Sequence, residues 1–218
     1  SLESLLNIYQ KLSDWPQAIN TANRFAAISN IDKNFEIVHF YCEIIDNNLK
    51  SKNFKESLSN IKAAQKIDKT HIRLNLTLIS YYIDVGCYDF AIEKIKELIS
   101  IDPTFILLTH QQLYYCYNIS GNPDDFMEYA LSILAITSNL NVVIKMLIFI
   151  NGHNYEHGNI RDILINIMGY EIVPKSIVNL FNKDFDNLTE AKADYSDILE
   201  LLNIACCNNY AYKCSSCG

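Results

Sequence analysis

The last residues of the chain contain the pattern with the clearest chemistry, a Cys-x-x-Cys pair followed by glycine. Two serines separate Cys214 from Cys217, and Gly218 follows directly. This spacing lets two thiolates converge on one metal ion while backbone N–H groups of the turn stabilise the charge on sulfur. A tetrahedral iron or zinc site needs two further thiolates. We therefore expect a second pair downstream in a longer parent chain, and no metal stably bound by this chain alone.

Two other interpretations of this pair stay open. A redox-active dithiol of the thioredoxin type would follow a strand, and no strand is predicted before Cys214. An inert pair of thiols in a tail would need no chemistry at all.

A second segment has metal-ligand spacing but the wrong context. His153-x-x-Glu156-His157 matches the inverted zinc-peptidase motif, in which both histidines must share one helix face. Gly152 and Gly158 flank the motif, so the segment is predicted to be a turn between two helices. The sequence also contains no glycine-rich phosphate loop, serine nucleophile elbow or paired-carboxylate signature. We predict that the chain is not an enzyme.

The composition excludes several other classes of protein. Half of the 218 residues are hydrophobic, and only 6 Gly and 4 Pro are present, which favours helices over many short strands. The net charge of −7 argues against nucleic acid as a partner. The longest apolar stretch, residues 142–150, is interrupted by Lys145 and falls short of the ~20 residues that cross a bilayer. Seven cysteines, most of them in apolar helical context, suit the reducing cytosol.

An internal repeat predicts the elements that position any binding residues. Residues 72–103 have aromatic, small and apolar residues at the spacing of a tetratricopeptide helix-turn-helix unit. The small residue Ala91 lets the second helix approach the first closely, and Pro103 ends the second helix. The same template places Ala18 and Ser57 in the small-residue position of earlier units, and Asp125 or Phe126 in the next, about 34 to 39 residues apart.

The fold class is therefore predicted to be all-α, an α-solenoid of tetratricopeptide-type repeats. We expect about four helix pairs in residues 1–138, among them helices over residues 36–49 and 54–67 and a helix that starts at Asn122-Pro123. Residues 139–208 keep helical periodicity without the template and are predicted to form irregular pairs that cap the stack.

A solenoid of this kind has a concave face lined by the first helix of every pair, and a mixed polar and aromatic groove suits a peptide or protein surface. The alternative for each position is an ordinary solvated surface. The template spacing predicts that the groove consists of Asn7, Gln10, His39, Cys42, Glu43, Asp46, Arg73, Leu76, Ser80, Ile83, His110, Gln111, Tyr114 and Tyr117.

Beyond the repeat, several runs of residues resemble a known family. These are Phe-Glu-Ile-Val-His-Phe-Tyr-Cys-Glu at residues 35–43, Leu-Leu-Asn-Ile-Tyr-Gln at residues 5–10 with Trp15, and the terminal residues 212–218 with their cysteine pair. Together they resemble the lipopolysaccharide assembly protein B family, over essentially the whole chain.

The resemblance implies a membrane-anchored architecture for the longer parent. Members of the family have an N-terminal inner-membrane helix, cytoplasmic tetratricopeptide repeats and a C-terminal rubredoxin-like module with two Cys-x-x-Cys pairs that holds iron or zinc. Residues 209–218 would then begin that module, with Cys214 and Cys217 as its first ligand pair. The implied location is the cytoplasmic face of the bacterial inner membrane.

The resemblance also implies a function without catalysis. The family acts as an adaptor that limits lipopolysaccharide synthesis by bringing the committing deacetylase of lipid A synthesis to a membrane AAA protease. Lipopolysaccharide assembly membrane proteins are further implied partners. A homodimer of the parent is an open alternative.

Two alternative functions remain. A generic tetratricopeptide module that grips acidic C-terminal tails would need a groove lined by Lys and Arg, and Arg73 alone qualifies. An electron carrier with a rubredoxin-like iron site would need a complete metal centre that cycles reversibly.

Overall fold

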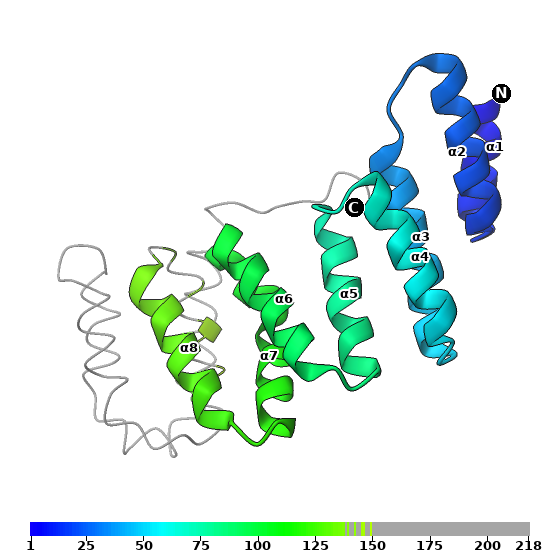
Figure 1. Cartoon of the computed structure of the whole chain (residues 1–218). Helices are drawn as coiled ribbons and strands as arrows, with labels where there is room; N and C mark the ends of the chain where they lie inside the picture. Colours follow the sequence, from blue (N-terminus) through cyan, green and yellow to red (C-terminus); the bar gives the residue numbers. More distant parts are fainter. Residues whose placement is uncertain (138, 140–141, 143–144, 147–148, 150–218) are drawn as a thin grey trace, which may run out of the picture. The chain divides into compact units, whose positions relative to one another are not determined.

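The computed structural model describes residues 1–137 together with residues 139, 142, 145, 146 and 149. In this part of the chain every regular element is a helix (Figure 1). The helices are α1 (Leu2–Lys11), α2 (Trp15–Ser29), α3 (Asn34–Lys50), α4 (Phe54–Ile67), α5 (Ile72–Asp84), α6 (Tyr88–Ile101), the short 3-10 helix η1 (Pro103–Phe105), α7 (Ile106–Ile119) and α8 (Pro123–Ile136).

Helices that are consecutive in the sequence pack as antiparallel pairs, and each pair packs on the next one. α1 contacts α2, α3 contacts α4 and α5 contacts α6, while α3 also lies against α5. Residues 1–133 form one compact unit. The all-α helical repeat fold predicted from the sequence is confirmed for the described residues. None of the helices in this part combines the length and the hydropathy that a bilayer crossing requires.

The same turn recurs between the two helices of each pair. It contains one residue in the left-handed region, Ser13 (φ 55°), Lys52 (φ 57°), Gly86 (φ 77°) or Gly121 (φ 78°). The two N–H groups that follow the helix donate back to carbonyls of its last turn, a pattern known as the Schellman motif. These hydrogen bonds are Ser13 to Gln10 and Asp14 to Tyr9, Lys52 to Leu49 and Asn53 to Asn48, Gly86 to Ile83 and Cys87 to Tyr82, and Gly121 to Asn118 and Asn122 to Tyr117.

The small-residue position of each unit lies five residues after the left-handed residue of its turn. Ala18, Ser57 and Ala91 are fully buried, as a close approach of paired helices requires. The Ser57 hydroxyl is satisfied by donating to the Asn53 carbonyl at 3.1 Å. In the fourth unit Phe126 is fully buried and Asp125 is exposed, so the structure selects Phe126 from the two candidates.

Proline ends α6 as predicted. The helix stops at Ile101, Asp102 is extended, and its carboxylate accepts a hydrogen bond from the Thr104 N–H at 2.8 Å. Pro103 then begins η1, since proline lacks an N–H and suits the first position of a helix.

The core is divided into layers between neighbouring helix pairs. No pair can bury its apolar faces alone, so the pairs stabilise each other by stacking. The layer between the first and second pairs contains Leu6, Ala18, Ala22, Ile37 and Phe40. The layer between the second and third pairs contains Val38, Cys42, Ile45, Leu49, Ile61, Ala64, Leu74 and Leu78.

Candidate protein-binding site

A network of polar side chains joins α3 to α5 at the surface. His39, Glu43 and Asp46 follow each other at intervals of four and three residues on α3, which places them on one face of the helix. Arg73 reaches them from the first turn of α5, because α5 lies against α3. The structure therefore brings together four residues that the repeat template assigned to the groove.

Arg73 is the centre of this network. Its Nη2 donates to Glu43 Oε1 at 2.5 Å and lies 3.3 Å from Asp46 Oδ2. Its Nη1 lies 2.9 Å from His39 Nδ1 and 3.1 Å from His39 Nε2. A guanidinium can only donate, so the ring nitrogen of His39 that it binds accepts and carries no proton.

The network is partly exposed and carries an excess of negative charge. About a third of each of the Arg73, Glu43 and Asp46 side chains is accessible. One guanidinium faces two carboxylates, so the formal charge of the four residues is −1 with neutral His39. The Arg73 charge is already neutralised, so the four residues of the network offer no unpaired cation with which to grip an acidic tail.

Burial and the guanidinium shift the ionisation of this site. Burial raises the pKa of the Asp46 carboxyl above its usual value, although the hydrogen bond from Arg73 opposes the change. Burial, and after it the positive charge of Arg73, lowers the pKa of His39 below 6.5. The raised pKa of Asp46 and the lowered pKa of His39 both favour the neutral form of the side chain.

The other predicted groove residues occupy the first helix of each pair, as the template requires. Gln10 is partly exposed and Asn7 is exposed on α1. Leu76, Ser80 and Ile83 are partly exposed on α5. On α7, Gln111 is exposed and His110 and Tyr114 are partly exposed, and the Tyr114 ring packs edge-on against Phe126 of α8.

The structure corrects the prediction for Cys42. This side chain is fully buried in the layer between the second and third pairs. Burial raises the pKa of its thiol to about 11. Position 42 continues the apolar stripe of Val38, Ile45 and Leu49, and it is one residue away from the exposed face that Glu43 marks.

Tyr117 is a second correction. Only 6% of it is exposed, and its ring contacts the Lys96 ammonium of α6, with a distance of 5.5 Å from Nζ to the ring centroid. The Tyr117 side chain thus packs towards α6, the second helix of the third pair, and does not line the predicted groove.

Sequence reasoning missed Phe35 and His71, which border the network. Phe35 lies in the first turn of α3 and is 64% exposed, and the centroid of its ring is 4.6 Å from that of the His71 ring. His71 is buried at the start of α5, where its Nδ1 accepts from the Leu74 N–H. Its Nε2 has no hydrogen-bond partner among the described residues. A signal existed for Phe35, since it precedes His39 by one helical turn.

The predicted metal ligands Cys214 and Cys217 lie outside the described residues, as do residues 209–218 as a whole and most of residues 139–208. Within the described part, no group of three or more His, Cys, Asp or Glu side chains is arranged to hold a metal ion.

Comparison with known proteins supports the resemblance noted from the sequence. The chain is 29% identical to lipopolysaccharide assembly protein B of Escherichia coli K12 over 129 residues, which are 59% of this chain and 33% of the relative. It is 26% identical to the protein of the same name from Haemophilus influenzae over 146 residues, 67% of this chain and 37% of that protein. The chain thus spans about a third of the length of these curated relatives. No protein-family model matches it. The name of the relatives describes assembly, not a catalysed reaction.

Proposed function

We propose that this chain is the protein-binding repeat region of a non-enzymatic adaptor that regulates lipopolysaccharide assembly. The similarity to lipopolysaccharide assembly protein B supports the process, and the stacked helix pairs support the mode of action. An adaptor raises the effective concentration of one protein near another, and this requires binding surfaces but no catalytic group.

The specific action that we propose is delivery of the committing deacetylase of lipid A synthesis to a membrane AAA protease. This would take place at the cytoplasmic face of the inner membrane, where lipopolysaccharide assembly membrane proteins would be further partners. The resemblance of residues 5–10, with Trp15, and of residues 35–43 to the family supports this mechanism.

The observation that best supports a binding role is the exposed Phe35 ring beside the Arg73 network. Exposed aromatic residues on a rigid support are typical energetic centres of protein interfaces. Phe35 lies on the buried ring of His71, so its position is defined before a partner arrives. The surrounding network supplies a polar rim with acceptor oxygens on Glu43 and Asp46.

Phe90 provides a matched control for an experiment on Phe35. It is 58% exposed at the start of α6 and its ring stacks on Tyr82 at a centroid distance of 5.6 Å. We would measure binding of this chain to the purified deacetylase and to the soluble part of the protease by biolayer interferometry. The Phe35→Ala variant should bind at least about tenfold more weakly, whereas Phe90→Ala should match the unmodified chain.

Circular dichroism of both variants would verify that the repeats stay folded. Equal binding by the Phe35→Ala variant would place recognition on another surface of the chain. Absence of binding of either protein to the unmodified chain would refute the delivery mechanism for this part of the molecule.

We also propose that Cys214 and Cys217 supply one thiolate pair of an iron or zinc site, which their spacing supports. Because two thiolates without a second pair hold a metal only weakly, titration of the reduced chain with a large excess of Co²⁺ would test it. Thiolate-to-cobalt absorption that disappears in a Cys214→Ser variant is expected, and identical absorption in that variant would refute the assignment.

A further inference from the structure

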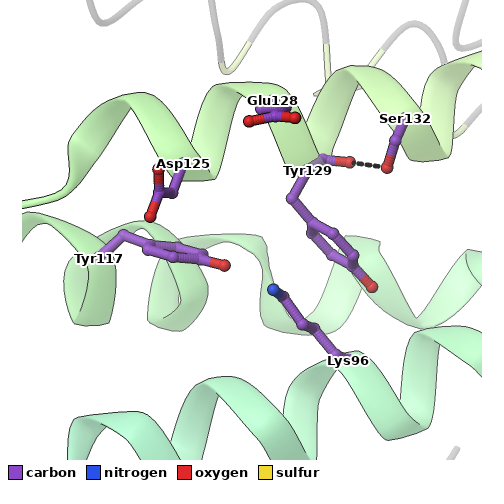
Figure 2. A pocket seen from close by; sticks show the side chains of 6 residues that line it. All are labelled: Lys96, Tyr117, Asp125, Glu128, Tyr129 and Ser132. Atoms are coloured by element: carbon purple, nitrogen blue, oxygen red, sulfur yellow. Dashed lines mark hydrogen bonds between the residues drawn. The ribbon is translucent and has the colours of Figure 1, made fainter.

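A second surface with unusual chemistry lies on α6, α7 and α8 and shares no residue with the Arg73 network. It is a hollow of about 380 Å³ (Figure 2). The side chains that line it are Lys96, Tyr117, Asp125, Glu128, Tyr129 and Ser132.

Among the residues that the structure describes, two aromatic rings hold the Lys96 ammonium at this hollow. Its Nζ lies 4.8 Å from the centroid of Tyr129 and 5.5 Å from that of Tyr117, and the amine points between the two rings (Figure 2). No ion pair between Lys96 and a carboxylate of the described residues is present. Lys33 and Lys94, by contrast, each bind a glutamate three residues away. The Lys96 ammonium therefore keeps its hydrogen-bond donors for a ligand.

The rim of the hollow has the opposite charge. Asp125 and Glu128 are exposed and three residues apart on α8, which places them on neighbouring positions of one face. Neither forms an ion pair within the described part of the chain. Ser132 adds no free donor, since its hydroxyl donates to the Tyr129 carbonyl at 2.7 Å.

We propose that this hollow binds a protein segment in which an acidic side chain neighbours a basic one. The acidic group accepts hydrogen bonds from the Lys96 ammonium between the tyrosine rings, and the basic group pairs with Asp125 and Glu128. Such a segment matches both signs of charge in the site, which gives specificity as well as attraction.

Ligands of a single charge fit the site less well. Two unpaired carboxylates at the rim repel a polyanion such as phosphate. A lone cation would meet an aromatic cage that Lys96 already occupies. Burial, and after it the neighbouring Tyr117, raises the pKa of Tyr129, so its hydroxyl stays protonated.

The test is a nuclear magnetic resonance titration of the isotopically labelled chain with short peptides blocked at both ends. The main probe is Gly-Lys-Glu-Lys-Gly, and the comparison probes are Gly-Lys-Gln-Lys-Gly, Gly-Ala-Glu-Ala-Gly and inorganic phosphate. We expect shifts of the Lys96 and Tyr129 signals, with the mixed-charge peptide binding at least about threefold more tightly than each comparison probe. Equal or tighter binding of phosphate or of a peptide with one sign of charge would overturn the proposal.

Three variants separate the ligand classes. Lys96→Met keeps an unbranched apolar side chain but removes the charge, and the pair Asp125→Asn with Glu128→Gln removes the acidic rim. Both should weaken the mixed-charge peptide, while Lys94→Met on the same helix should leave it unchanged. Tighter peptide binding by the rim variant would indicate a simple anion site, and tighter binding by Lys96→Met a simple cation site. Either result, or equal loss in the Lys94→Met control, would refute the proposal.

Discussion

Arg73 Nη2 donates a hydrogen bond to Glu43 Oε1 at 2.5 Å, although the two residues are 30 positions apart in the sequence. The bond links α5 to α3, so it joins the second helix pair to the third at the surface. The stability of stacked repeats is the sum of the stabilities of the pairs and of the interfaces between neighbouring pairs. This bond therefore contributes to the interface between the second and third pairs.

Replacing Arg73 with methionine should destabilise the repeats. The change leaves the Glu43 and Asp46 carboxylates close together without a cation. An exposed ion pair contributes up to about 1 kcal/mol and the loss of one partner of a buried pair costs about 3–5 kcal/mol, so we expect a loss of about 1–2 kcal/mol at this half-buried site. Urea unfolding would measure it. Arg24→Met, on an exposed position of α2, should change the free energy of unfolding by less than about 0.5 kcal/mol, and an equal loss there would contradict the argument.

Stability should fall when the pH is lowered from about 7 to about 5. Burial, and after it the positive charge of Arg73, lowers the pKa of His39. Burial also lowers the pKa of His71, although the negative charge of Asp68 opposes this change. The unfolded chain then binds more protons than the folded one in this range, so the free energy of unfolding rises with pH up to about 6.5. The His39→Gln, His71→Gln double variant should show a flatter pH dependence in urea unfolding, and an unchanged slope would contradict this assignment.

Asp46 acts in the opposite direction and in a lower pH range. Burial raises the pKa of Asp46 in the folded state, although Arg73 opposes the change. Between pH 3.8 and this raised pKa, the carboxyl is therefore protonated more often in the folded state than in the unfolded state. Its contribution is therefore present below pH 3.8 and lost as the pH rises through the folded pKa.

The cysteines should differ in their reactivity towards iodoacetamide. Burial raises the pKa of Cys42 and of Cys116 to about 11, and both side chains are fully buried, whereas Cys87 is exposed. The thiolate is the reactive form, so at neutral pH the folded chain should be alkylated at Cys87, and at Cys42 and Cys116 after denaturation. Mass spectrometry of tryptic peptides would assign the sites. Alkylation of Cys42 in the folded chain at the rate of Cys87 would contradict its burial.

A glycine should stabilise the turn of the second unit. Lys52 has φ 57° at the position where Gly86 and Gly121 stand in the later units. A left-handed conformation costs an L-residue about 1–2 kcal/mol, so Lys52→Gly should raise the free energy of unfolding by about 0.5–1 kcal/mol after the entropy of glycine is subtracted. Gly86→Ala is the reciprocal change. Open space surrounds the methyl group that Gly86→Ala adds, so the loss of stability in this variant should report the backbone strain. An unchanged free energy of unfolding in either variant would refute the reasoning.

The helix pairs and their turns were predictable from residue types and spacing. Buried positions such as Ala18 and Ala91 recur with the repeat, and Pro103 stops a helix wherever it occurs. These features depend on residues close together in the sequence. The metal pair Cys214 and Cys217 depends equally on local spacing and remains a prediction.

Only the tertiary structure decided which side chains meet. Cys42 and Glu43 are adjacent in the sequence, but one lies in the core and the other at the surface, because the packing of α5 against α3 sets the rotation of the helix. The same packing brings Arg73 to Glu43 and places Phe35 on His71. The sequence by itself determined that the chain folds into helix pairs and about where they lie: helices predicted over residues 36–49 and 54–67 are found at Asn34–Lys50 and Phe54–Ile67. The distances between helices determined the charge network, the exposed aromatic ring and the hollow at Lys96, since contacts across repeats depend on positions that no local pattern encodes.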